Sequence, residues 1–315
     1  MIRYDVFGLA GDPYAVEELR PFDHPNGRLP LELDGFFDLK ALNRYMQECV
    51  DAERPAFVIV SGHNWSGRTS IARCVLDLYR KLRDLENRFL VQEINEAFYS
   101  GFNMMANIFS YLQMAAGETD LTFTTELEKR LTDAAKIDEI TYQPQFRSLG
   151  KQFETELANQ NNGPHGFGVM IEGIAEVELL KAARTVFDSI PCVLVFTHLV
   201  GENAFTASMD GIKPEEAHIM RLRPLVSRQI RLLAEGRWEQ ATTEHRCPFD
   251  GEGVETAFMP DRLVISMALK KLSRLLEHRL RSHEGTTPPS DPSTLYMSYD
   301  WLVERVRAMN EWNKP

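Results

Sequence analysis

Short apolar runs alternate along the chain with longer segments in which apolar residues recur every three or four positions. The short runs predict buried β-strands, and the longer segments predict amphipathic helices that bury one side. The expected strands lie at 57–60, 88–94, 169–172, 192–196 and 218–222. Because helical segments separate these strands, the sequence predicts an α/β fold with a parallel sheet and right-handed crossovers.

Helices are expected between the strands, and the pattern becomes purely helical after the last strand. The expected helices lie at 39–50, 70–82, 98–116, 146–159, 177–188, 225–240, 251–258, 261–282 and 298–312. A Pro-rich segment precedes the last helix and reads as a linker. We therefore predict an arm (1–35), an α/β domain (36–222), a helical lid (223–282), a linker (283–294) and a C-terminal amphipathic helix (295–315).

One glycine-containing turn after the first strand indicates a site for binding phosphate. It matches the phosphate-loop pattern G-x-x-x-x-G-K-[ST], with arginine in place of lysine. Such a loop presents main-chain N–H groups and a helix N-terminus to an anion. The residues expected to bind a nucleotide, ATP rather than GTP, are Gly62, Asn64, Trp65, Ser66, Gly67, Arg68, Thr69 and Ser70. A strand-to-helix turn without a ligand is the alternative interpretation.

Two further positions complete the predicted site. In phosphate-loop enzymes an acidic residue at the end of a neighbouring strand holds Mg²⁺ or readies the attacking water. Glu172 is the candidate for either role, and Thr69 is the expected Mg²⁺ ligand of the loop. Thr197 ends the next strand, beside His198, and is the candidate contact to the γ-phosphate. Glu172 as an ordinary strand-end carboxylate is the alternative.

Two departures from the usual pattern predict weak hydrolysis. Arg68 replaces the loop lysine, and Gly173 stands where many such enzymes carry a second acid. A guanidinium can pair with phosphate through two hydrogen bonds, but it places its charge differently from an ammonium. We therefore expect nucleotide binding to survive better than turnover.

The order of arm, phosphate loop, VMIEG, CVLVFTHL and helical tail resembles the AAA+ and STAND-type P-loop ATPases, with altered Walker A and Walker B motifs. The phrase PFDGEGVETAFMPDRLVISMALKKL is similar to the helical lid of that group. The resemblance implies that Arg262 faces the phosphates, because a Pro-x-Arg segment opens a lid helix there. It also implies that YDVFGLAGDPY and LELDGFFDLKALNRYM form the arm that touches adenine.

Composition narrows the class of protein. The chain has 315 residues, is 43% hydrophobic and carries a net charge of −11, so a broad nucleic-acid surface is not favoured. The four dispersed cysteines suit free thiols in a reducing cytoplasm, and no apolar run is long enough for a membrane span. A zinc site of His245, Cys247, His278 and His283 fits no standard spacing.

These observations favour a cytoplasmic protein that binds ATP and Mg²⁺ and acts as a nucleotide-dependent switch or assembly subunit. The C-terminal helix is expected either to dock on a protein partner or to pack on its own lid, and a second copy of the chain is a candidate partner. Two other functions stay open. One is a scaffold of the same fold that binds no nucleotide, and the other is an active ATPase acting on nucleic acid, for which the basic residues of 270–281 argue.

Overall fold

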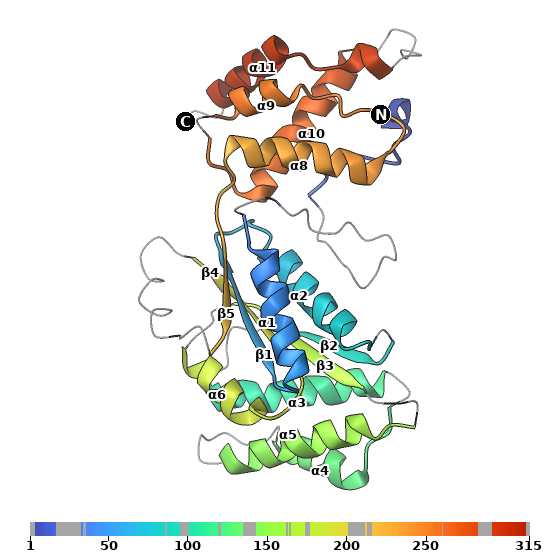
Figure 1. Ribbon diagram of the computed structural model, residues 1–315, viewed down its shortest axis with the longest axis vertical. Helices are drawn as coiled ribbons and strands as arrows, with labels where there is room; N and C mark the ends of the chain where they lie inside the picture. The colour runs from blue at the N-terminus through green and yellow to red at the C-terminus, as the bar shows by residue number, and fades with distance from the viewer. Residues whose placement is uncertain are drawn as a thin grey trace.

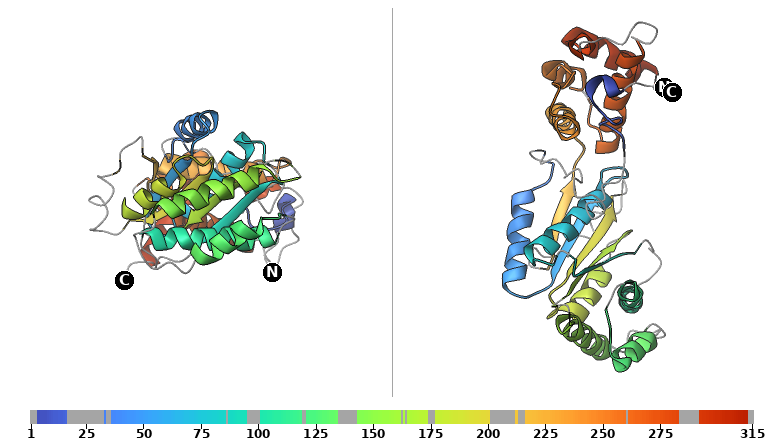
Figure 2. Two further views of the ribbon diagram at one scale, coloured as in Figure 1. Left: turned by 90° about the horizontal axis from the view of Figure 1, so that it is seen from below. Right: turned by 90° about the vertical axis from the view of Figure 1, so that its right-hand side faces the viewer.

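The computed structural model describes most of the chain as two lobes, an α/β lobe and a helical lobe beyond one end of the strands (Figures 1 and 2). The described residues are 4–16, 33, 36–85, 87–94, 101–118, 121–134, 143–161, 163, 165–173, 177–200, 212, 216–259, 261–282 and 292–312. None of the helices within these ranges is both long enough and apolar enough to cross a membrane.

The α/β lobe is built on a parallel sheet. Its strands are β1 (Ala56–Gly62), β2 (Phe89–Ile94), β3 (Gly166–Ile171), β4 (Val193–Leu199) and β5 (His218–Leu222). They follow the order β2-β3-β4-β1-β5, and every pair runs parallel. The predicted α/β fold with a parallel sheet is therefore confirmed. Since β1 lies between β4 and β5, the loop that follows β1 emerges between the carboxyl ends of these two parallel strands.

Helices cover both faces of the sheet. Alternate residues of β1 point to opposite faces, so Val58 and Val60 belong to one hydrophobic cluster and Phe57 and Ile59 to another. The first cluster includes α1 (Leu39–Asp51) and α2 (Arg68–Leu82). The second includes α3 (Gly101–Gly117), α4 (Thr125–Ala134), α5 (Gln143–Ala158) and α6 (Val177–Phe187).

Strand β3 begins at Gly166, three residues before the expected start at 169. Glycines are typical of turns, but Gly166 and Gly168 lie within the strand and serve packing. A Cβ on Gly168 would lie 2.8 Å from side-chain atoms of Leu76 and Phe89. Gly168 therefore allows α2 and β2 to approach the strand closely.

The helical lobe contains α8 (Ser227–Ala241), α9 (Gly251–Ala257), α10 (Ile265–Arg281), a short 3₁₀ turn (Pro292–Leu295) and α11 (Tyr299–Trp312). The expected helix at 261–282 was placed four residues too early, because α10 begins at Ile265. The preceding segment is extended instead, since Leu225 and Leu263 pair through two backbone hydrogen bonds of 2.7 and 3.2 Å.

The first and last described segments, Tyr4–Phe7 and α11, lie on this lobe rather than on the sheet (Figure 1). A 3₁₀ turn at Tyr4–Phe7 places the Phe7 ring edge-on to Trp238, with the ring centroids 4.9 Å apart. The hydroxyl of Tyr14 donates to the carbonyl of Ala234 at 3.1 Å. Leu302 and Val306 of α11 are buried in the cluster that also contains the lid helices, so α11 packs on its own lid.

Candidate functional site

The phosphate loop joins β1 to α2. Gly62 ends the strand, and a Cβ there would lie only 2.4 Å from the Oγ of Ser66, so the loop folds back over a position that only glycine fits. Gly67 has φ +86°, in the left-handed region, and α2 begins at the next residue. The first N–H groups of a helix have no partner within the helix. The N-terminus of α2 is therefore oriented to receive an anion from the loop side.

The structure brings together the predicted residues at the ends of β3 and β4. Thr69 Oγ1 donates to Glu172 Oε1 at 2.5 Å, and the N–H of Gly173 donates to Thr197 Oγ1 at 3.4 Å. A hydroxyl beside a carboxylate is the oxygen donor set that suits Mg²⁺. Thr69 and Glu172 therefore fit the two roles expected of metal ligands.

Arg68 contributes a positive charge beside the phosphate loop. Burial lowers the pKa of the Arg68 guanidinium from its ordinary value, while the carboxylate of Glu172 opposes this effect. His198 is 4% exposed, and burial together with the Arg68 cation lowers its pKa to about 4. His198 is therefore neutral at pH 7, and Arg68 provides positive charge beside the loop.

A cavity of about 300 Å³ lies between the phosphate loop and the lid. The loop contributes Trp65, Ser66, Gly67, Arg68, Thr69, Ser70 and Ile71. The opposite wall is apolar apart from two side chains, and consists of Val16, Leu33, Phe36, Phe37, Leu233, Arg237, Ile265, Ser266 and Leu269. Arm, core and lid thus converge on one cavity, of the volume at which small-molecule sites begin.

Two buried hydroxyls on the walls of this cavity have no hydrogen-bond partner among the described residues. Ser66 is 2% exposed and Ser266 is 5% exposed, and neither Oγ is hydrogen-bonded within the described part of the chain. Buried hydroxyls are nearly always hydrogen-bonded in proteins. Since both serines line the cavity, a polar ligand placed there could satisfy both.

Not every predicted residue reaches this cavity. Gly62, Asn64, Glu172 and Thr197 are not among the residues that line it. Arg262 is exposed and also lies outside the lining. The phosphate contact of Arg262 therefore stays a prediction.

The lid residues that do face the loop were missed by sequence reasoning. Arg237 lies four residues after Leu233 on α8, and Ser266 lies three residues before Leu269 on α10. Both polar residues therefore occupy the buried side of an amphipathic helix, with 7% and 5% exposure. A polar residue on an apolar helix face is the signal that could have identified them.

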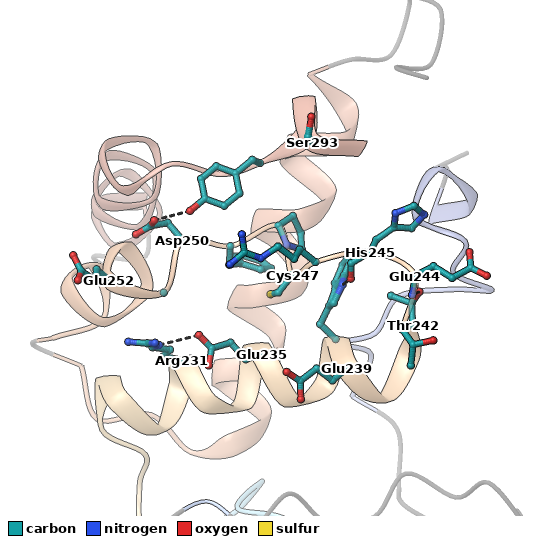
Figure 3. A pocket seen from close by; sticks show the side chains of 17 residues that line it. Arg231, Glu235, Glu239, Thr242, Glu244, His245, Cys247, Asp250, Glu252 and Ser293 are labelled. Carbon is teal, nitrogen blue, oxygen red and sulfur yellow. Dashed lines mark hydrogen bonds and ion pairs between the residues drawn. The ribbon is translucent and has the colours of Figure 1, made fainter. Parts of the chain in front are cut away.

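A second and larger cavity, of about 1330 Å³, lies within the lid (Figure 3). Its lining includes five carboxylates, those of Glu235, Glu239, Glu244, Asp250 and Glu252. Two of these are already paired, since Arg231 contacts Glu235 at 2.8 Å and the Tyr296 hydroxyl donates to Asp250 at 2.6 Å. None of the predicted nucleotide-binding residues lines this cavity.

The alternative zinc site gains no support from the geometry. Within the described ranges, no group of three histidine, cysteine or acidic side chains is arranged to hold a metal ion. His283 lies outside the described residues.

Comparison with known proteins identifies solved structures with a similar fold. The chain matches no known family model and has no significant match among curated protein sequences. Among solved structures it is similar to the ORC2 protein of Aeropyrum pernix, with ADPNP and ADP in its complexes (TM-score 0.54, 12% identity, 97% of this chain and 75% of that chain). It is also similar to Drosophila ORC bound to DNA (TM-score 0.51, 11% identity, 95% of this chain and 64% of that chain). Cdc6p of Pyrobaculum aerophilum matches with a TM-score of 0.47 and 11% identity, over 88% of this chain and 66% of that chain.

At these identities the likeness establishes the fold alone. The two ORC structures named above have TM-scores above 0.5, and their matches extend over at least 95% of this chain. In its described residues the chain has a fold like that of these ORC structures, a parallel sheet of five strands with helices on both faces and a helical region after it.

Proposed function

We propose that the chain binds ATP with Mg²⁺ in the cavity between the phosphate loop and the lid, and acts as a nucleotide-dependent switch or assembly subunit. The observation that carries the proposal is the pair of buried, unsatisfied hydroxyls of Ser66 and Ser266, one on each side of that cavity. A scaffold that bound nothing would gain no partner for either hydroxyl. A triphosphate offers acceptors to both.

The proposed contacts divide by chemistry. The N–H groups at the start of α2 and the guanidinium of Arg68 hold the phosphates, and Arg237 adds a second cation from the lid. The apolar part of the cavity, from Val16 and Phe36 to Leu233, encloses the base. Thr69 and Glu172 hold the Mg²⁺, which when bound neutralises phosphate charge.

Slow hydrolysis follows from the same residues. Glu172 is followed by Gly173, so one acidic side chain serves where two are usual. If Glu172 holds the metal, its carboxylate is not free to take a proton from water. Because the cavity walls come from both lobes, binding would favour one angle between lid and core without requiring turnover.

Binding is tested by thermal unfolding and calorimetry with Mg-ATP. A ligand at about one hundred times its Kd should stabilise the folded state by about 2.7 kcal/mol. The substitution Ser266→Asp places a carboxylate against the expected phosphates and should abolish the shift. Met267→Asp is the matched control, because it adds the same charge in the same helix turn at a side chain that is 45% exposed. The absence of any shift in the wild-type chain, or equal shifts in the two variants, would overturn the proposal.

DNA binding is the second candidate function. A structural neighbour, Drosophila ORC, was solved bound to DNA. In this chain Lys270, Arg274 and Arg281 lie exposed on α10, although the net charge of the whole chain is −11. A titration with duplex DNA at several salt concentrations separates the cases, since phosphate contacts give an affinity that falls steeply with salt. No salt-dependent binding would remove this candidate.

A further inference from the structure

Trp65 occupies an unusual place in the phosphate loop. Its backbone has φ +66°, in the left-handed region, which is unfavourable for a bulky residue. Its side chain is 67% exposed, so the ring is not held by burial. A conformation of this kind persists only where surrounding contacts impose it.

Those contacts come from the lid. The carbonyl of Trp65 accepts a hydrogen bond from the N–H of Ser266 at 3.3 Å. The ammonium of Lys270 lies 5.1 Å from the centroid of the Trp65 ring, within the range of a cation–π interaction. Ser266 and Lys270 are four residues apart on α10, so they belong to one face of that helix. A single helix face thus holds both the backbone and the ring of one loop residue.

The same helix turn also borders the nucleotide cavity. The N–H of Ser266 donates to the loop, and the same residue lines the cavity. Ile265 packs beside Gly67, where a Cβ would lie 3.4 Å from Cγ2 of Ile265. Movement of α10 would therefore change the loop backbone at residues 65–67 directly.

From these contacts we infer that Trp65 is a positioning residue that couples the lid to the phosphate loop. The inference rests on the proposed nucleotide binding and specifies how that site is regulated. With α10 in place, Lys270 and Ser266 hold Trp65 in the left-handed conformation, and the loop keeps the shape that binds phosphate. When the lid moves away, Trp65 is released and the loop relaxes, so nucleotide affinity falls.

A double-mutant cycle with Lys270→Gln and Trp65→Leu tests the coupling. An exposed cation–π contact corresponds to a change in Kd of about two- to fivefold. We expect Lys270→Gln to weaken Mg-ATP binding by that factor in the wild-type background and to have no effect in the Trp65→Leu background. Arg274→Gln is the matched control, because Arg274 is exposed one turn further along α10. Equal effects of Lys270→Gln in both backgrounds would show that Lys270 acts independently of Trp65 and would overturn the inference.

Hydrogen exchange without nucleotide keeps the coupling testable even if ATP does not bind. Lys270→Gln should speed amide exchange in the loop peptide 63–70, which belongs to the other lobe, whereas Arg274→Gln should leave that peptide unchanged. Unchanged exchange in the Lys270→Gln variant would refute the coupling. If Lys270→Gln speeds exchange in this peptide but Mg-ATP gives no thermal shift in the wild-type protein, the proposed function is refuted and the coupling is not.

Discussion

A guanidinium at position 68 changes what the phosphate loop can do with a triphosphate. Arg68 lines the cavity, and burial lowers its pKa while Glu172 stands close enough to oppose that effect. The guanidinium is longer and forked, and it can bind two phosphate oxygens at once. Its charge is spread over the whole group, so it stabilises the negative charge that develops on one leaving oxygen less well than a compact ammonium does.

Arg68→Lys should therefore raise turnover while leaving nucleotide affinity within a few fold. A gain of about tenfold in kcat corresponds to about 1.4 kcal/mol of barrier. Steady-state phosphate release measures the gain, and Arg68→Ala, which should lose binding, is the control for the role of the charge. An Arg68→Lys variant that binds Mg-ATP but turns over no faster than wild type would contradict this account of Arg68.

Thr69→Val removes the hydroxyl that donates to Glu172 and keeps the shape of the side chain. We expect the ability of Mg²⁺ to strengthen ATP binding to fall about tenfold, a change of about 1.4 kcal/mol. Thr69→Ser retains the hydroxyl and should keep the magnesium effect. Calorimetry with ATP, with and without Mg²⁺, gives the comparison, and equal magnesium effects in Thr69→Val and wild type would remove Thr69 as a ligand.

His198 makes stability depend on pH in a defined window. Its folded-state pKa of about 4 lies below the ordinary value of 6.5, so below pH 6.5 the unfolded chain takes up a proton that the folded chain refuses. The free energy of unfolding should fall as the pH falls from 6.5 to 4, by up to about 1.4 kcal/mol per pH unit for this group. In His198→Asn the slope should be shallower, although burial also lowers the pKa of His218 and leaves a background slope. Denaturant unfolding at several pH values tests it, and identical slopes would contradict the assignment.

The sequence predicted which helices and strands are present better than it predicted the residues at which they begin. Apolar runs identified β1, β3 and β4 most clearly, because a parallel sheet buries its inner strands on both faces and leaves nearly unbroken apolar segments, whereas the edge strands β2 and β5 contain polar residues. The start of β3 was missed because Gly166 and Gly168 read as turn residues, whereas the structure uses them for close packing. The start of α10 was missed because the pairing of Leu225 with Leu263 is a contact between distant residues that periodicity does not reveal.

In the candidate site, too, local sequence patterns revealed some features, and contacts between distant residues determine the others. The loop from Ser66 to Ser70 and the pair Thr69 and Glu172 could be predicted, because a local motif and a strand end fix them. The lid side could not, because it depends on the angle at which α8 and α10 meet the core. Arg262, chosen from its place beside a proline, stays a prediction that the cavity lining does not include.

The contact between α9 and α11 gives a prediction about the lid. A Cβ on Gly253 would lie 2.9 Å from the backbone Cα of Tyr299, so Gly253→Ala should push α11 away and destabilise the lid by about 1–3 kcal/mol. At Gly251 the nearest atoms belong to the flexible side chains of Arg231 and Glu235, so Gly251→Ala should cost much less. Chemical denaturation of both variants tests it. Equal stability of the two variants would show that α11 does not depend on this packing.

For the protein as a whole, the two lobes meet where residues of the loop, arm and lid line one cavity. The arm packs on the lid through Phe7 and Tyr14, so arm and lid are expected to move together as one body against the sheet. A ligand that contacts both bodies favours the angle at which all its contacts are made.

Mg-ATP should therefore narrow the range of angles between the lobes, and this change can be measured in solution. We expect small-angle X-ray scattering to show a smaller radius of gyration with saturating Mg-ATP than without it, since closing two lobes on a ligand makes an elongated chain more compact. Ser266→Asp, which should not bind, should scatter alike in both conditions, and Met267→Asp should behave as wild type. Calorimetric binding without any change in scattering would mean that the nucleotide stabilises the fold but does not move the lid, and the switch would then have to be sought in assembly with a partner.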